Sequence, residues 1–425
     1  MSSRWPYISL ALGLALGALW LALRPAQSQA GDSSDSPTHR QAKSVANSPA
    51  IKLSAKATRP GALPGESAGQ QGARLFREAA DLLNAEPLEE LKMLDFKKPE
   101  DLERIRQLRQ TPEFLRWRQL IRETIACGAV DWGIDWSQGS HTLLPEIGLQ
   151  RDAISLLSNL SVMETAEGDA NCMTLLEASK LSRIMKSPDT LIQQLVASAC
   201  SGIVNSKVAD HLAQSAPEAL DRLAESLKED SKAYSSDCLQ SLDGEIQHYL
   251  KSALFDHPEE LVASFGETKC EAEISQLLKD TRFMTEAKAN INQAALQMKN
   301  TWEKALTWQE RAEAQQAYNQ SLREFLQQNA SAAAAEKMQD HIASSTTLLG
   351  KFLDYEARRQ STLAALQIEQ FRRANGRLPA TLEEAGWLGY GDATGRAMSY
   401  EVKDGKAVIT TAQESGQKKS YEVKW

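Results

Sequence analysis

Apolar residues recur every three or four positions through most of the chain beyond Gly72, a spacing that predicts amphipathic helices. Three such helices follow one another as far as Ile203, which is also predicted to face inward, and they are interrupted at 167–169 and at 187–188. Their predicted inward-facing side chains include Leu149, Ala153, Leu156, Leu157, Leu160, Met163, Met173, Leu176, Leu181, Ile184, Met185, Ile192, Leu195, Val196 and Ala199. Antiparallel helix pairs with short turns are typical of tetratricopeptide-like repeats, but no fixed period recurs. Residues 71–345 are therefore predicted to form a repeat-like helical body.

A long, mostly polar helix with a heptad-like apolar seam is predicted from Phe283 to Ala314. The seam residues are Met284, Ala287, Ile291, Ala295, Met298, Trp302 and Ala305. A second helix through 317–329 would return along the first and complete a helical arm. The spacing also permits a coiled-coil partner, but pairing within the chain is the prediction.

The segment 346–425 is predicted to be a long helix followed by a small β module. The helix runs to Ala374, where Asn375-Gly376 matches a helix C-terminus. Alternating residues then predict strands at 399–403, 406–411 and 420–425. Asp404-Gly405 predicts a hairpin between the first two. The predicted fold class is mainly α, a helical-hairpin, repeat-like bundle with a small C-terminal αβ module (a three-stranded antiparallel sheet) and an N-terminal transmembrane helix.

The beginning of the chain has a different composition. Residues 5–23 carry no charge and have an arginine on either side. About 20 apolar residues span a bilayer as a helix, whereas the core of a signal peptide is usually about 7–15 residues long. Residues 1–24 are therefore predicted to be a transmembrane anchor, with a signal segment cleaved after Ala30 as the alternative. Residues 25–70 have too few large apolar side chains to form a core and are predicted to be a disordered tether.

The predicted tether contains Gly65-Glu-Ser-Ala-Gly69, a formal match to the G-x-S-x-G nucleophile elbow. That motif activates its serine only on a tight turn between a strand and a helix. No strand is predicted before Gly65, so the match is interpreted as accidental.

The net charge and the cysteine spacing argue against nucleic-acid binding and against a zinc site. The net charge is −8, which argues against a nucleic-acid partner because phosphates require a basic face. The five cysteines are far apart, with no C-x-x-C pair, which argues against a zinc site. Cys172 with Cys200, and Cys238 with Cys270, flank predicted helical turns at similar distances. In an oxidising compartment these pairs can form two disulfides; the alternative is that they are buried free thiols.

Two carboxylates and two indoles, Asp131, Trp132, Asp135 and Trp136, form the most noticeable local cluster. Such residues can make a sugar subsite in which the two Asp act as the acid and base of a glycosidase. The preferred interpretation is that the indoles pack against the first core helix and the carboxylates cap turns. The histidines have no metal-ligand spacing, and no phosphate loop or dinucleotide motif is present. No catalytic residue, metal or cofactor is therefore predicted.

The end of the chain resembles a known family. Phe371-Arg-Arg-Ala-Asn-Gly-Arg-Leu-Pro-Ala-Thr-Leu-Glu-Glu384 and Asp392-Ala-Thr-Gly-Arg-Ala-Met-Ser-Tyr400 are similar to the globular part of type II secretion pseudopilins. The start of the chain lacks the Gly-Phe-x-x-x-Glu cleavage pattern of that family, so polymerisation is not implied. The acidic calcium loop of major pseudopilins has no clear counterpart, so no metal site is implied either.

A second resemblance covers the middle of the chain. Cys127 to Gly139, Leu143-Leu-Pro145, Glu167-Gly-Asp169 and Thr190 to Leu195 resemble a large, uncharacterised family of bacterial membrane-anchored proteins. That family joins a helical body to the same pseudopilin-like tail. The resemblance implies an architecture and a location and no activity.

These observations lead to one expected function and two alternatives. The expected protein is a non-enzymatic scaffold that is anchored in the bacterial inner membrane through residues 5–23, with its bulk extracytoplasmic. It would bind proteins of the cell envelope through helical faces, and a homo-oligomer is compatible with this. One alternative is a carbohydrate-binding protein or glycoside hydrolase built on Asp131, Trp132, Asp135 and Trp136. The other is an accessory component of a secretion or pilus-like machine.

Overall fold

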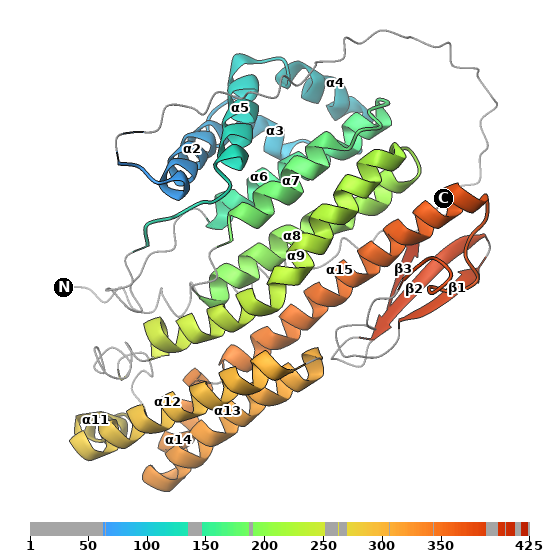
Figure 1. The fold of residues 1–425 in the computed structure, drawn as a ribbon. Helices are drawn as coiled ribbons and strands as arrows, with labels where there is room; N and C mark the ends of the chain where they lie inside the picture. The colour runs from blue at the N-terminus through green and yellow to red at the C-terminus, as the bar shows by residue number, and fades with distance from the viewer. Residues whose placement is uncertain are drawn as a thin grey trace, which may run out of the picture. The chain divides into compact units, whose positions relative to one another are not determined.

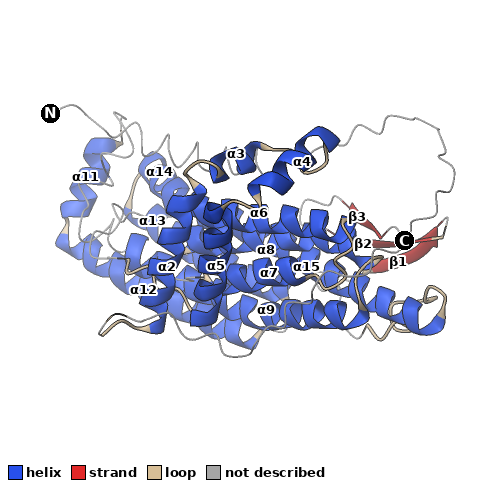
Figure 2. Ribbon diagram, turned by 90° about the horizontal axis from the view of Figure 1, so that it is seen from above, coloured by secondary structure: helices blue, strands red, loops and turns tan. Residues whose placement is uncertain are grey.

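The computed structural model describes residues 63, 65–134, 147–186, 190–250, 262, 270–305, 307–342, 344–387, 398–403, 405–412 and 418–423. They form a mainly helical fold with a small antiparallel sheet near the C-terminus, which confirms the predicted fold at that level (Figures 1 and 2). The predicted anchor, residues 5–23, lies outside these ranges. Within them, no helix combines the length and apolar character that a bilayer crossing needs.

The helices have the following bounds. In chain order they are α2 (Ala68–Leu83), α3 (Leu88–Met93), α4 (Pro99–Leu108), α5 (Pro112–Cys127), α6 (Ile147–Ala166), α7 (Met173–Ile184), α8 (Leu191–Leu212), α9 (Pro217–Gly244), the π-helical η2 (Glu245–Leu250), α11 (Glu271–Lys279), α12 (Thr281–Lys304), α13 (Trp308–Asn329), α14 (Ala332–Ile342) and α15 (Ser344–Asn375). The helices α4, α5 and α9 begin with proline, which costs no intrahelical hydrogen bond at a first position.

The start of α2 corrects one predicted boundary. The helix begins at Ala68, inside the segment predicted to be tether, because Ser67 caps it. The Ser67 hydroxyl accepts from the Gln70 amide N–H at 3.2 Å, and the Gln70 side-chain oxygen accepts from the Ser67 N–H at 3.0 Å. This reciprocal capping box is a common start of a helix. Ser67 is also the serine of the G-x-S-x-G match, and its role here is that of a helix cap.

Two further boundaries differ from prediction. The sequence pattern predicts separate helices at 217–228 and 231–255, but α9 continues through Asp230, and the Asp230 carboxylate lies in a buried ionic cluster. The helix predicted from Phe283 to Ala314 instead ends at Lys304, and α13 begins at Trp308. Thr307 starts α13 through a capping box with Glu310, so the hairpin turns earlier than the heptad pattern indicates.

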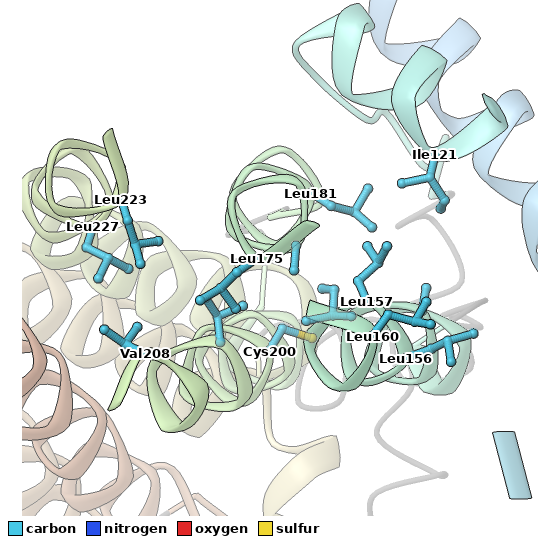
Figure 3. Packing of buried hydrophobic residues seen from close by; sticks show 14 of the residues in the cluster. Ile121, Leu156, Leu157, Leu160, Leu175, Leu181, Cys200, Val208, Leu223 and Leu227 are labelled. Atoms are coloured by element: carbon cyan, nitrogen blue, oxygen red, sulfur yellow. The ribbon is translucent and has the colours of Figure 1, made fainter. Parts of the chain in front are cut away.

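Most buried apolar side chains fall into two clusters. The first core gathers side chains from helices α2 to α9, the second half of α15 and the sheet. Figure 3 shows part of it, with labelled residues from α5 to α9. The second core gathers side chains from the start of α8, from α9, η2 and α11 to α14, and from the first half of α15. Phe352 and Ala357 of α15 lie in the second core, whereas Leu363 and Leu366 lie in the first. The helix α15 therefore contributes to both cores. The segments 71–345 and 346–425, which were predicted as separate parts, pack into the same two cores.

The sheet consists of β1 (Ser399–Lys403), β2 (Lys406–Ala412) and β3 (Lys418–Val423), in the order β1-β2-β3 with antiparallel pairing. Tyr400 stands opposite Ile409, which stands opposite Tyr421. Ala407 and Ile409 alternate into the first core, and β2 packs against α15. The Tyr400 hydroxyl donates to the Pro379 carbonyl at 2.9 Å, which attaches the sheet to the segment after α15.

The backbone at 129–131 lies directly against the first turns of α2. The Asp131 N–H donates to the Gly69 carbonyl at 2.9 Å. A Cβ atom at Gly72 would stand 2.3 Å from the Ala129 carbonyl oxygen, and one at Gly69 would stand 2.8 Å from the Asp131 Cβ. Glycine at both positions therefore permits the close approach, since any other residue would place an atom in occupied space.

The substitution Gly72→Ala is expected to lower the free energy of unfolding by about 1–3 kcal/mol, because the new methyl group meets a backbone carbonyl that cannot easily yield. Gly148→Ala is the matched control, since a Cβ there has no neighbour within 4 Å. It is expected to be neutral or to stabilise α6 by up to about 1 kcal/mol. Urea unfolding followed by circular dichroism compares the two, and equal stability would contradict the close contact.

Candidate binding groove and buried polar clusters

Trp132, a predicted ligand-cluster residue, belongs to the first core. Its side chain is 6% exposed and stands edge-on to Phe76, with ring centroids 5.7 Å apart. The indole N–H donates to the Met185 carbonyl at 3.5 Å. The neighbouring Asp131 is exposed, and its carboxylate accepts from the Gly133 N–H at 2.9 Å, closing a local turn. Trp132 therefore packs in the core and Asp131 closes a turn, as in the interpretation that gave this cluster a packing role. Asp135 and Trp136 lie outside the described residues.

All five cysteines are free thiols in the structure, so neither permitted disulfide is formed. The pairing of Cys172 with Cys200 assumed that both lie at one level of a helix hairpin. Cys172 instead precedes α7, and its Sγ lies 3.5 Å from His211 Nδ1 near the end of α8. Cys200 lies near the middle of α8, roughly 16 Å along the helix from His211 at ~1.5 Å per residue. Counting residues from the turn therefore placed the first pair wrongly.

Cys238 is fully buried in the second core, where its Sγ accepts from Gln194 Nε2 at 3.6 Å. Burial raises the pKa of this thiol, and it raises the pKa of Cys200 to about 12. Cys270 is partly buried and stands immediately before α11. Cys172, Cys200 and Cys238 thus correspond to the buried-thiol alternative.

A polar cluster that the sequence did not predict surrounds His211 of α8. The ring is fully buried, with Nε2 at 3.0 Å from Ser161 Oγ and Nδ1 at 2.8 Å from Thr165 Oγ1. Cys172 Sγ completes the cluster and lies 2.6 Å from Ser215 Oγ. Burial lowers the pKa of His211 to about 4 and raises that of Cys172, so both groups are neutral near pH 7. A neutral thiol shielded from solvent is not an activated nucleophile, and the cluster is interpreted as structural.

A second unpredicted cluster is ionic and lies where α8, α9 and α15 meet the end of α7. Lys186 Nζ pairs with Asp230, and Arg359 Nη1 lies 3.4 Å from Asp230 Oδ2. The Ser201 hydroxyl donates to the same carboxylate at 3.1 Å. Arg359 also stacks over Tyr234, with 4.3 Å between its guanidinium carbon and the ring centroid. Burial alone would raise the pKa of Asp230, but the two cations outweigh it and hold the pKa below its usual value.

A groove of about 640 Å³ lies along the α12–α13 hairpin. Four alanines and a methionine supply its apolar lining, and these are Ala294, Met298, Ala305, Ala314 and Ala317. Ala294, Met298 and Ala314 are also buried members of the second core, whereas Ala305 is half-buried and Ala317 is exposed along the groove. Because an alanine side chain is a single methyl group, another helix backbone can approach such walls closely.

The polar residues of the groove are divided by charge between its two walls. On α12 these are Gln297, Asn300, Thr301 and Lys304, whereas α13 contributes Glu310 and Glu313. Glu310 accepts from the Thr307 N–H at 2.9 Å, and Glu313 accepts from Gln309 Nε2 at 3.0 Å. The α12 wall therefore ends in a cation, and the facing part of α13 carries two anions.

Tyr318 lines the groove from α13 and is 4% exposed. Its hydroxyl oxygen is buried and has no hydrogen-bond partner among the described residues. Burial raises the pKa of Tyr318, so the hydroxyl keeps its proton at neutral pH. The hydroxyl is inaccessible from outside, so its unpaired state is a cost of about 1–3 kcal/mol within the fold.

No family model, no curated protein and no solved structure matches this chain. The described residues also include no group of three or more His, Cys, Asp and Glu side chains that could hold a metal ion. The two resemblances in the sequence stay predictions.

Proposed function

We propose that the protein is a membrane-anchored, extracytoplasmic scaffold without catalytic activity, which binds a protein helix in the α12–α13 groove. The groove supports this proposal most directly, since it runs between two antiparallel helices with alanine on both walls. Helix-in-groove recognition uses this geometry, in which apolar residues of the bound helix fill the space between two helical ridges.

The proposed location rests on the sequence. Residues 5–23 form an uncharged stretch of the length that spans a bilayer, with Arg24 at its end. With the bulk of the chain extracytoplasmic, the groove would be presented to proteins of the cell envelope. The resemblance of the last residues to pseudopilins is consistent with that compartment.

Site-specific photocrosslinking of the full chain in cell membranes tests this function. A photoreactive amino acid at Ala317, which is exposed in the groove, is expected to give a protein adduct. The same substitution at Ala289 is the matched control, since this alanine of α12 is also exposed but does not line the groove. An additional Thr301→Arg substitution should abolish the adduct at 317 by filling the groove. No adduct at 317, or equal adducts at both positions, would contradict the proposed function.

A further inference from the structure

We propose that the helix bound in this groove comes from a second copy of the chain, so that two α12–α13 hairpins pack groove to groove. This inference rests on the proposed function, because it names the partner of the same groove. In this arrangement a two-fold axis runs parallel to the helices and passes between the hairpins. Each α12 then lies between its own α13 and the α13 of the second copy, and all four neighbouring pairs are antiparallel. This is the geometry of an up-down-up-down four-helix bundle.

Charge complementarity favours a second copy over an unrelated helix. A two-fold axis parallel to the hairpin keeps each residue at its own height, so residues near the turn of one copy meet residues near the turn of the other. Lys304 ends the α12 wall next to the turn, and Glu310 and Glu313 occupy the first turns of the α13 wall. The Lys304 wall of each copy therefore faces the glutamate wall of the other, twice over. The positive charge on the α12 wall therefore complements the negative charges on the α13 wall, so the groove is complementary to a second copy of itself.

Packing fits the same arrangement. The alanines on both walls allow the close helix approach that a bundle requires. With 24 residues in α12 and 22 in α13, the hairpin is about 33–36 Å long, which gives four-helix contact over several turns.

The oligomeric state of the full chain in detergent micelles tests the inference. Sedimentation over a range of protein concentrations is expected to show a dimer. Ala317→Arg should raise its dissociation constant by at least about tenfold, because the longer side chain overfills a close-packed contact. Ala289→Arg adds the same charge outside the groove and should change the constant by no more than about twofold. Pairing through the N-terminal segment is common to all variants, so the difference between the two reports on the groove alone.

A charge exchange then tests the pairing of the walls. Lys304→Glu and Glu313→Lys should each weaken the dimer by about threefold at low salt, since each places like charges opposite one another. The double variant restores opposite charges and should recover the affinity of the unchanged protein, and high salt should reduce all three effects. Glu310 is left intact because it caps α13.

The outcomes separate this inference from the proposed function. A monomer at every concentration, or equal dimerisation of Ala317→Arg and Ala289→Arg, overturns the second copy as the partner. If the photocrosslinker at 317 still captures a different protein, the scaffold function stands without the dimer. If it captures nothing, both proposals fail.

Discussion

The substitution Asp230→Ala is expected to lower the free energy of unfolding by about 3–5 kcal/mol, the cost of breaking a buried ionic cluster by removing one partner. Asp230 is 6% exposed and is the anion that Lys186 and Arg359 share. Without it, both cations stay buried with less compensation, and the Ser201 hydroxyl loses its acceptor. The effect should be large because the cluster joins α8, α9 and α15 at the boundary between the two cores.

The neighbouring Glu229→Ala is the matched control for this prediction. Glu229 lies on the same helix and pairs with Arg183, but its side chain is 53% exposed. An exposed pair contributes about 0–1 kcal/mol, so the control should remain close to the unchanged protein. Urea unfolding at one fixed protein concentration compares the variants, because self-association would shift the midpoint. Similar losses for Asp230→Ala and Glu229→Ala would show that the cluster is not buried as described.

Replacing both partners of the Lys186–Asp230 ion pair gives a second comparison. A combined Lys186→Met and Asp230→Leu variant replaces the ion pair by apolar side chains and should recover much of the loss of Asp230→Ala. Additive losses in that double variant would indicate that Asp230 acts through contacts other than Lys186.

Apolar periodicity was sufficient to predict the mainly helical fold, because a helix that must bury a stripe shows that stripe in its sequence. Leu157, Leu160 and Leu181 were predicted to face inward, and all three lie in the first core. The start of α13 was also present in the sequence as Thr307-x-x-Glu310. The heptad-like spacing continues through Ala305, and it favoured one long helix over the capping signal.

The buried clusters could not be predicted, because their members are distant in the sequence. Asp230 lies 44 residues from Lys186 and 129 from Arg359. A charged residue in the middle of a helix is usually a solvated one, so nothing local distinguishes Asp230 from Glu229. The level predicted for Cys172 beside Cys200 was wrong for a related reason, because residue counts from a turn do not reveal that Cys172 lies before its helix.

The groove depends on what other helices leave uncovered. The alanines at 294, 305, 314 and 317 are visible in the sequence, but alanine is equally common in a core and on a surface. Only the packing of α9, α11, α14 and α15 around the hairpin decides that this side stays open. Asp131 and Trp132 show the converse, because a conspicuous local pattern there serves packing and a turn.

Lowering the pH from about 7 to about 4 is expected to remove about 3 kcal/mol of stability through His211 alone. Burial holds the pKa of the folded histidine near 4, against about 6.5 when the chain is unfolded. Between these values the unfolded chain binds a proton that the folded chain does not, so the free energy of unfolding falls as the pH falls. The contribution is fully present above about pH 6.5 and lost near pH 4.

The change is measured as a difference between the unchanged protein and His211→Gln, which cannot titrate in this range. Subtraction is needed because Glu245 acts in the opposite direction. Its pKa is raised to about 7, mainly by burial, so its contribution to stability falls as the pH rises from about 4.5 to about 7. Both proteins contain Glu245, and its contribution cancels in the difference. His211→Gln should therefore lose stability at neutral pH, where its hydrogen bonds to Ser161 and Thr165 are altered, and converge on the unchanged protein as the pH approaches 4. Parallel stability curves over this range would mean that His211 takes up its proton equally in the folded and unfolded chain, and so is not buried as a neutral ring.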